Sequence, residues 1–198
     1  MITTIIFDLS EVYLQGMKGT EERLNLKYKT RLENFNFMHS KPANHFFRGQ
    51  ITETEFWEGI ISEFDLKITV KKLKEIVREN FKEIDGTRTI IEKLKNNGYK
   101  LGLLSNQAKE WVNYCEKQYD FHKLFHSRMY SFEISVCKPE KRAYELMLDR
   151  LQAKPEECLY IDDYDVNLMP AKKLGLVTLQ FENSEKLKTD LKKLNIRF

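Results

Sequence analysis

The chain has 198 residues, of which 41% are hydrophobic and 32% are charged, a composition typical of a globular protein with a heavily charged surface. Its 33 basic and 30 acidic residues are interspersed, so the formal charge of +3 argues against a nucleic-acid partner. No apolar run approaches the ~20 residues that span a bilayer, so we expect no membrane partner.

The three cysteines, Cys115, Cys137 and Cys158, are odd in number and lack the CxxC spacing of metal sites. A disulfide framework is therefore not expected. The N-terminal apolar run lacks the basic start of a signal peptide and is interrupted by Asp8. These features predict a protein of the reducing cytoplasm.

The first predicted element is a buried β-strand that contains Ile5, Ile6 and Phe7. Both of its faces are apolar, which is typical of a strand inside a parallel sheet. Asp8 follows at once, where such a strand reaches the carboxyl edge of its sheet, and ligands of open α/β sheets bind at that edge. Asp8 is a candidate nucleophile or metal ligand, although an Asp in this place can also be a turn residue.

Residues 14–83 differ from what precedes them, because apolar residues recur at helical spacing and no convincing strand appears. A capping box at residues 52–55 begins one helix, and Thr69 caps another. Weaker helical patterns cover residues 21–32 and 42–47. We predict a unit of about four helices inserted after the first strand.

From Gly86 onward, helical and strand patterns alternate. Helices are predicted over residues 87–97, 109–118, 141–151 and 166–174, and strands over residues 99–104, 128–131, 158–161 and 177–179, before a terminal helix. This alternation indicates right-handed βαβ units in an α/β fold with a Rossmann-like, doubly wound parallel sheet. The predicted core comprises residues 1–13 and 84–198.

Three predicted strands end in polar side chains, which should meet because parallel strands share one carboxyl edge. Lys138, in a loop before a helix, could add a positive charge there. Carboxylates, a hydroxyl, loop amides and an ammonium are the groups that hold Mg²⁺ and a phosphoryl group. The residues at the strand ends are Asp8, then Ser105 and Asn106, then Asp162 and Asp163.

Four short motifs in this order resemble the haloacid dehalogenase-like hydrolase superfamily along essentially the whole chain. They are Phe7-Asp8-Leu9-Ser10, Leu104-Ser105-Asn106, Lys138-Pro139-Glu140, and Ile161-Asp162-Asp163 followed by Asn167. The chain is most similar to the phosphatase branch with a small α-helical cap, which holds sugar-1-phosphate phosphatases and the N-terminal phosphatase domain of soluble epoxide hydrolase. The resemblance implies that residues 14–83 form this cap.

The resemblance also implies roles for individual residues. Asp8 would be the nucleophile that becomes an aspartyl-phosphate, and Lys138 would bridge it to the phosphate. Ser105 and Asn106 would bind phosphate. The metal ion, Mg²⁺, would lie between Asp8, the Ser10 carbonyl and Asp163, with Asp162 as a helper. The implied partner is a small phosphorylated metabolite.

Ser10 departs from the pattern of the superfamily's phosphatases, which usually carry an acid/base Asp at this position. A neutral hydroxyl transfers protons poorly at pH 7, and general acid–base catalysis contributes ~10²–10⁴ in rate. We therefore predict a slow hydrolase that favours good leaving groups, such as sugar 1-phosphates or acyl phosphates. The neighbouring Glu11 should point away from Ser10 in an extended chain and is a poor substitute.

Simpler interpretations remain open. Ser105, Asn106, Asp162 and Asp163 could cap helices, and Lys138 could be a solvated lysine. Arg48 could meet the substrate, whereas Trp57 on a helix face is more typical of a core residue. A dehalogenase would attack carbon with Asp8 and would not need the acidic pair. A non-catalytic phosphate-binding or regulatory protein of the same fold is the alternative to a phosphatase.

Overall fold

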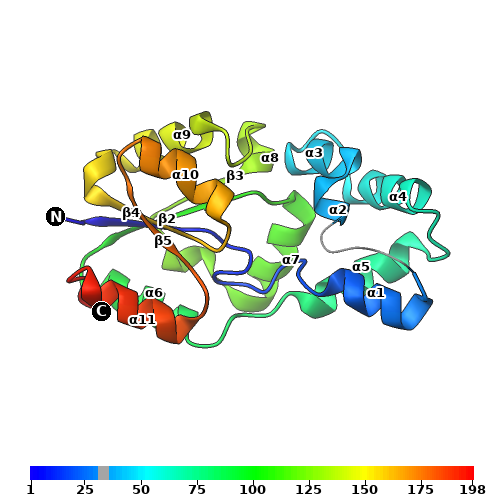
Figure 1. The fold of residues 1–198 in the computed structure, drawn as a ribbon, viewed down its shortest axis with the longest axis horizontal. Helices are drawn as coiled ribbons and strands as arrows, with labels where there is room; N and C mark the ends of the chain where they lie inside the picture. Colours follow the sequence, from blue (N-terminus) through cyan, green and yellow to red (C-terminus); the bar gives the residue numbers. More distant parts are fainter. Residues whose placement is uncertain (31–35) are drawn as a thin grey trace.

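The computed structural model describes residues 1–30 and 36–198. Five strands form one parallel sheet, in the order β3-β2-β1-β4-β5, with β1 at its centre (Figure 1). The strands are β1 (Thr4–Phe7), β2 (Lys100–Ser105), β3 (Ser127–Tyr130), β4 (Cys158–Asp162) and β5 (Val177–Gln180). The predicted Rossmann-like α/β fold is confirmed.

Helices connect the strands and fill the long segment between β1 and β2. That segment contains α1 (Thr20–Tyr28), α2 (Asn36–His39), α3 (Lys41–Phe47), α4 (Glu53–Glu63) and α5 (Val70–Asn80), followed by α6 (Thr87–Asn96). The later helices are α7 (Lys109–Tyr119), α8 (Ser131–Ile134), α9 (Lys141–Leu151), α10 (Asp165–Lys173) and α11 (Ser184–Lys193), with 3₁₀ turns η1 (His122–Leu124) and η2 (Pro155–Glu157).

The predicted elements agree with these bounds to within a few residues. The helix predicted over residues 21–32 ends at Tyr28, and the last two residues of that prediction lie outside the described residues. Helices α2 and α8 were not predicted because four residues are too few to show a 3.6-residue period.

The helix starts that the sequence predicts are formed by side-chain caps. The Thr52 hydroxyl accepts a hydrogen bond from Glu55 N–H at 3.2 Å, and the Glu55 carboxylate accepts one from Thr52 N–H at 2.7 Å. This reciprocal pair is the predicted capping box. Thr69 Oγ1 likewise accepts from Lys72 N–H. At the other end of α6, Gly98 adopts a φ of 85°, which a residue with a side chain rarely does.

Alternate residues of β1 face opposite sides of the sheet. Ile6 belongs to the buried cluster under α9 and α10, whereas Ile5 and Phe7 belong to the cluster that includes side chains of α6, α7 and α11. Helix α9 approaches so closely that a Cβ on Gly102 would lie 2.8 Å from Leu151 Cδ1. Helices cover both faces, and ligands of such sheets bind at the carboxyl edge.

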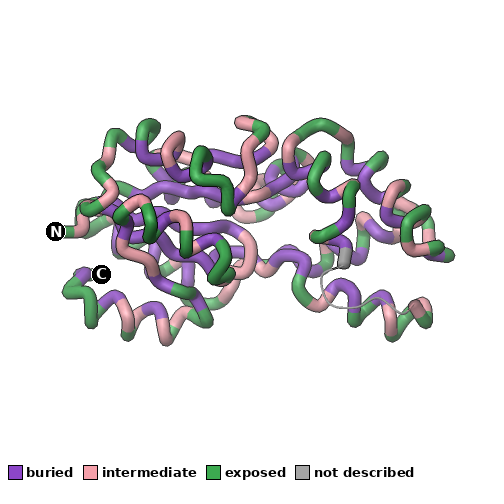
Figure 2. The backbone as a smooth tube through the Cα atoms, turned by 45° about the horizontal axis from the view of Figure 1, so that its top comes forward, coloured by how far each residue is buried: buried purple, intermediate pink, exposed green. Residues whose placement is uncertain are grey.

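The helices α1–α5 lie together beside this edge of the sheet (Figures 1 and 2). Their apolar side chains belong to the same buried cluster as Ile5 and Phe7. Trp111 of α7 makes this connection, since its ring lies 5.2 Å from that of Phe46 and 6.2 Å from that of Phe56. The insertion therefore shares a continuous apolar core with the sheet.

A buried carboxylate joins the insertion to α7. Glu53 is 3% exposed, and its Oε1 accepts a hydrogen bond from Trp111 Nε1 at 2.8 Å and from Trp57 Nε1 at 3.4 Å. The Arg78 guanidinium donates to both Glu53 oxygens at 2.7 Å. Burial opposes ionisation, but Arg78 and Trp111 outweigh it and hold the pKa of Glu53 below its usual value.

A second connection lies at Arg48, after α3. Its guanidinium donates to Glu140 Oε1 at 2.6 Å and to the Ser135 carbonyl at 2.8 Å. The next residue, Gly49, has a φ of 69°, and a Cβ there would lie 2.7 Å from the Phe132 carbonyl oxygen. Arg48 is thus paired with the loop that carries Lys138. Trp57 is completely buried, as expected of a core residue.

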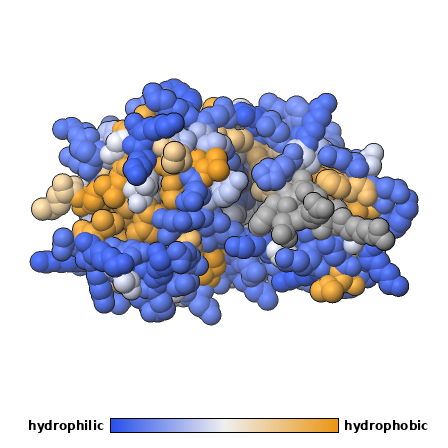
Figure 3. Space-filling model, viewed as in Figure 1, coloured by the Kyte–Doolittle hydropathy of each residue, from blue (hydrophilic) through white to orange (hydrophobic). Residues whose placement is uncertain are grey.

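The surface seen in Figure 3 is mostly hydrophilic, and apolar side chains gather between α10 and α11, near the edge strand β5. No helix in the described part of the chain is both long and apolar enough to cross a membrane. All three cysteines are unpaired, as expected.

Replacing Glu53 by Gln should destabilise the protein. The Arg78 guanidinium would lose its charged partner within the folded structure, so we expect the free energy of unfolding to fall by about 3 kcal/mol in urea titrations at pH 7. Because the pKa of Glu53 is lowered, the contribution is complete at neutral pH and should shrink as the pH falls through the folded-state pKa.

Glu58→Gln is the matched control, because Glu58 is exposed on the same helix. An equal, small effect of both substitutions would show that the Glu53 contacts contribute little to stability.

Candidate active site

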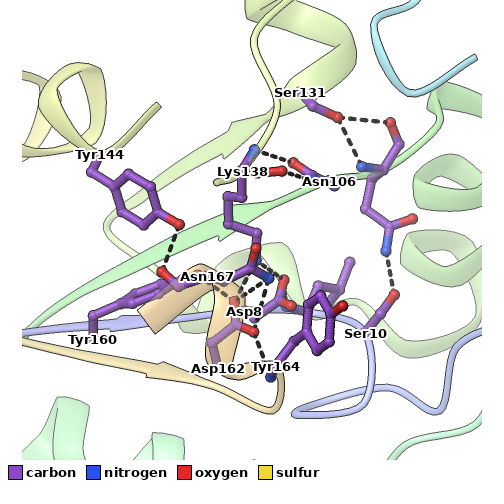
Figure 4. A network of polar contacts seen from close by, with 12 residues as sticks. Asp8, Ser10, Asn106, Ser131, Lys138, Tyr144, Tyr160, Asp162, Tyr164 and Asn167 are labelled. Carbon is purple, nitrogen blue, oxygen red and sulfur yellow. Dashed lines mark hydrogen bonds and ion pairs between the residues drawn. The ribbon is translucent and has the colours of Figure 1, made fainter. Parts of the chain in front are cut away.

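The polar residues predicted at the strand ends converge in the structure. Strand β1 lies between β2 and β4, with Phe7 opposite Leu103 and Ile161. Asp8 follows Phe7, while Ser105 and Asp162 are the last residues of β2 and β4. All three therefore lie at the carboxyl edge of the central strands, where Figure 4 shows Asp8 and Asp162.

Lys138 joins two of these strands. Its ammonium lies 2.9 Å from Asp8 Oδ1 and 2.7 Å from Asp162 Oδ2, and its side chain is 1% exposed. Burial alone would lower the pKa of Lys138, but Asp162 and Asp8 outweigh it and raise that pKa. Lys138 is therefore a buried cation held between two carboxylates, not a solvated lysine.

Asp162 is saturated with donors. Besides Lys138, it accepts hydrogen bonds from the Tyr160 hydroxyl, from Tyr164 N–H at 2.9 Å and from Asn167 Nδ2 at 3.0 Å. Burial pushes the pKa of Asp162 upward, but Lys138 and these donors hold it below its usual value. Asp162 thus remains ionised and orients Lys138, and Asn167 supports it from α10.

Asn106 contacts the backbone of Lys138. Its Oδ1 accepts from Lys138 N–H and its Nδ2 donates to the Lys138 carbonyl, both at 2.8 Å. The predicted phosphate contact of Asn106 would have to come from its backbone, because its carboxamide is engaged in this pair. The pair fixes the loop before α9 relative to β2.

Ser105 and Asp8 are neighbours. The Ser105 hydroxyl is close enough to the Asp8 carboxyl to lower its pKa. Its Oγ is buried, and no described residue meets the geometric requirements of a hydrogen bond to it. An unsatisfied buried hydroxyl is costly, and at this edge of the sheet it could donate to a bound ligand. Both strong contacts of Asp8, with Leu9 N–H at 2.7 Å and with Lys138, involve Oδ1 and leave Oδ2 available.

Asp163 completes an acidic cluster. One carboxylate oxygen from each of Asp8, Asp162 and Asp163 lies within 4.8 Å of the others. Among the described residues no donor reaches the Asp163 carboxylate. Burial and the charges of Asp8 and Asp162 raise the pKa of Asp163 to about 7, and burial raises that of Asp8 to about 6. The donor set is all oxygen and carries excess negative charge, which fits a hard divalent cation such as Mg²⁺.

Ser10 lies beside this cluster, in the loop after β1. Its Oγ accepts a hydrogen bond from Gln107 Nε2 at 2.5 Å, a contact that the sequence analysis did not foresee. The only sequence signal was that Gln107 directly follows Ser105 and Asn106. Glu11 has a φ of 60°, so the chain is not extended there as the prediction assumed. Its Oε1 accepts from Gly16 N–H at 2.9 Å, and a Cβ on Gly16 would lie 3.1 Å from both Glu11 Oε1 and Ser10 Oγ.

Comparisons with known proteins agree with this geometry. A haloacid dehalogenase-like hydrolase family model matches residues 4–181. The chain is 28% identical over 156 residues to flavin mononucleotide hydrolase 1 of Arabidopsis thaliana, covering 72% of this chain and 61% of that protein. It is 29% identical over 108 residues to mouse bifunctional epoxide hydrolase 2, covering 51% of this chain and 19% of that one. The chain thus spans less than two thirds of either relative.

Among solved structures, the fold is similar to that of a haloacid dehalogenase-family enzyme from Bacteroides thetaiotaomicron in complex with magnesium and inorganic phosphate. The TM-score is 0.73 at 20% identity, covering 92% of this chain and 96% of that one. The family match over nearly the whole chain, together with the shared fold, shows that this protein belongs to the haloacid dehalogenase-like hydrolase family.

Proposed function

We propose that the protein is a Mg²⁺-dependent hydrolase of small phosphate esters that works through an aspartyl-phosphate on Asp8. The observation that carries the proposal is the position of Lys138, whose ammonium is within hydrogen-bonding distance of Asp8 at the same sheet edge as the buried Ser105 hydroxyl. A lysine ammonium has three donors, and among the described residues Asp8 and Asp162 use two of them, so one remains for a phosphoryl oxygen.

The three carboxylates and the Ser10 carbonyl provide the groups for the metal ion. Asp8, Asp163 and the carbonyl would bind it directly, while Asp162 supports Lys138. Bound Mg²⁺ would neutralise phosphoryl charge and orient the group for displacement. Magnesium and phosphate in the related Bacteroides structure support this assignment.

The chain's own residues supply the attack. Asp8 Oδ2 is the oxygen left free to attack phosphorus, since Leu9 N–H and Lys138 hold Oδ1. Lys138 and the Ser105 hydroxyl would donate to the equatorial oxygens, where charge shifts in the transition state. Water then hydrolyses the aspartyl-phosphate. We further propose that residues 14–83 act as the cap that limits access of water and selects the substrate.

Ser10 determines which esters are hydrolysed well. Its hydroxyl is a neutral group and cannot protonate a strongly basic leaving oxygen at pH 7. Leaving groups that depart as stable anions avoid this requirement, so sugar 1-phosphates and acyl phosphates are favoured over simple alkyl esters.

Activity should depend on both metal and nucleophile. With p-nitrophenyl phosphate and Mg²⁺ we expect turnover that EDTA abolishes and added Mg²⁺ restores. Asp8→Asn keeps the shape of the side chain but removes the nucleophilic oxygen, so its rate should fall to that of the blank.

If no ester is hydrolysed while inorganic phosphate still raises the melting temperature, the chain is a phosphate-binding protein and the hydrolase proposal is wrong. Turnover of 2-chloropropionate without metal would instead identify a dehalogenase.

Introducing an acid at position 10 should broaden the substrate range. Ser10→Asp restores a group able to protonate the leaving oxygen, so we expect kcat/KM for an alkyl phosphate to rise at least tenfold, toward the ~10²–10⁴ of general acid catalysis, while p-nitrophenyl phosphate changes little. Ser62→Asp, at an exposed position of α4, is the control. Unchanged rates on both esters would refute the role of Ser10.

A further inference from the structure

The mechanism above does not use Gln107, although its side chain contacts the active site. Gln107 is 5% exposed, and its Nε2 donates to Ser10 Oγ at 2.5 Å. Figure 4 shows Ser10 and Ser131, which contact the side chain and the backbone of Gln107, respectively. Ser10 stands where the family's phosphatases usually carry the acid/base Asp. Because the buried Gln107 amide contacts Ser10, Gln107 is a candidate for a role in the reaction.

The backbone of Gln107 is anchored. Its N–H donates to Ser131 Oγ at 3.0 Å, and the Ser131 hydroxyl lies 3.3 Å from the Gln107 carbonyl oxygen, to which it donates. Ser131 is itself buried at the start of α8, after β3. The chain of contacts thus runs from β3, through the loop after β2, to Ser10 in the loop after β1.

Gly16 also lies against Ser10. A Cβ on Gly16 would lie 2.9 Å from Ser10 Cβ and 3.1 Å from its Oγ, so the backbone of Gly16 lies directly against this side chain. Gln107 and Gly16 both lie against the Ser10 side chain and restrict its rotamers.

The direction of the hydrogen bond determines where the Ser10 proton can go. A hydroxyl has one hydrogen and two lone pairs, and an amide nitrogen can only donate. Because Gln107 Nε2 supplies the hydrogen in their contact, the Ser10 proton is not used there. Within the described residues, Ser10 Oγ donates to no acceptor, so its proton is available to a ligand in the site.

We propose that Gln107 is a positioning residue that orients the Ser10 O–H toward the leaving-group oxygen, and that this neutral donor suffices only for phosphates carried on weakly basic oxygens, acyl phosphates above all. The inference rests on the proposed phosphatase activity and specifies its substrate class. A neutral donor stabilises charge developing on an oxygen that leaves as an anion, whereas it cannot supply the full proton that an alkoxide needs.

The first step balances without a proton from the protein. The bond from Asp8 Oδ2 to phosphorus forms while the bond from phosphorus to the leaving oxygen breaks, and its electron pair stays on that oxygen. Ser10 keeps its proton throughout and gives only a hydrogen bond. The released carboxylate or phenolate takes up any proton later, from solvent.

A double-mutant cycle tests whether Gln107 acts through Ser10. For Ser10→Ala, Gln107→Met and the double variant, kcat/KM is measured with Mg²⁺ on acetyl phosphate and on phenyl phosphates whose leaving groups differ in pKa. We expect both single variants to lose about twofold on the best aryl leaving group and about tenfold on unsubstituted phenyl phosphate. The double variant should lose no more than either single one.

Gln118→Met, at an exposed position of α7, should leave the profile unchanged. If Gln107→Met does not fold, Gln107→Asn provides the same test, because its carboxamide is one methylene too short to reach Ser10. A loss that is equal for all leaving groups, or that persists in the Ser10→Ala background, would overturn the inference and leave the phosphatase intact. If the unmodified protein shows no turnover above Asp8→Asn, the proposed function fails and this inference fails with it.

Discussion

The active edge of the sheet depends on one buried cation. The Lys138 ammonium lies out of solvent between Asp8 and Asp162, and a charge in such a place is stable only when it is paired and its donors are used. Much of the surrounding structure serves this pairing. Asn106 fixes the backbone of Lys138, and Tyr160 and Asn167 fix Asp162. The reactive groups are therefore oriented before any substrate arrives.

The positions of Asp8, Ser105 and Asp162 could be predicted because each lies at the carboxyl end of a predicted strand. A parallel sheet brings these ends to one edge, independently of the conformation of the loops. The contact of Lys138 with Asp8 was harder to predict, since its loop is distant in sequence from both partners. The sequence pattern suggested a positive charge at this edge, the resemblance to a known family suggested its contact with Asp8, and the ion-pair distances in the structure support both.

What the sequence could not show depends on the packing of loops. Asn106 was expected to bind phosphate, but its carboxamide forms two hydrogen bonds with the backbone of Lys138. No sequence pattern predicts such a contact between two loops. The contact between Gln107 and Ser10 joins loops from two strands and likewise has no periodic signal. The continuous apolar core through Trp111 could not be predicted either, because the sequence pattern indicates residues 14–83 as a separate helical unit and does not show what they pack against.

Both tryptophans of the chain, Trp57 and Trp111, donate to the same oxygen of Glu53, where the inserted helices meet α7. Their indole rings lie 6.4 Å apart. The intrinsic fluorescence of this protein is consequently a local probe of that junction. A change in emission on adding a ligand would report movement of the helices against α7, without any label having to be attached.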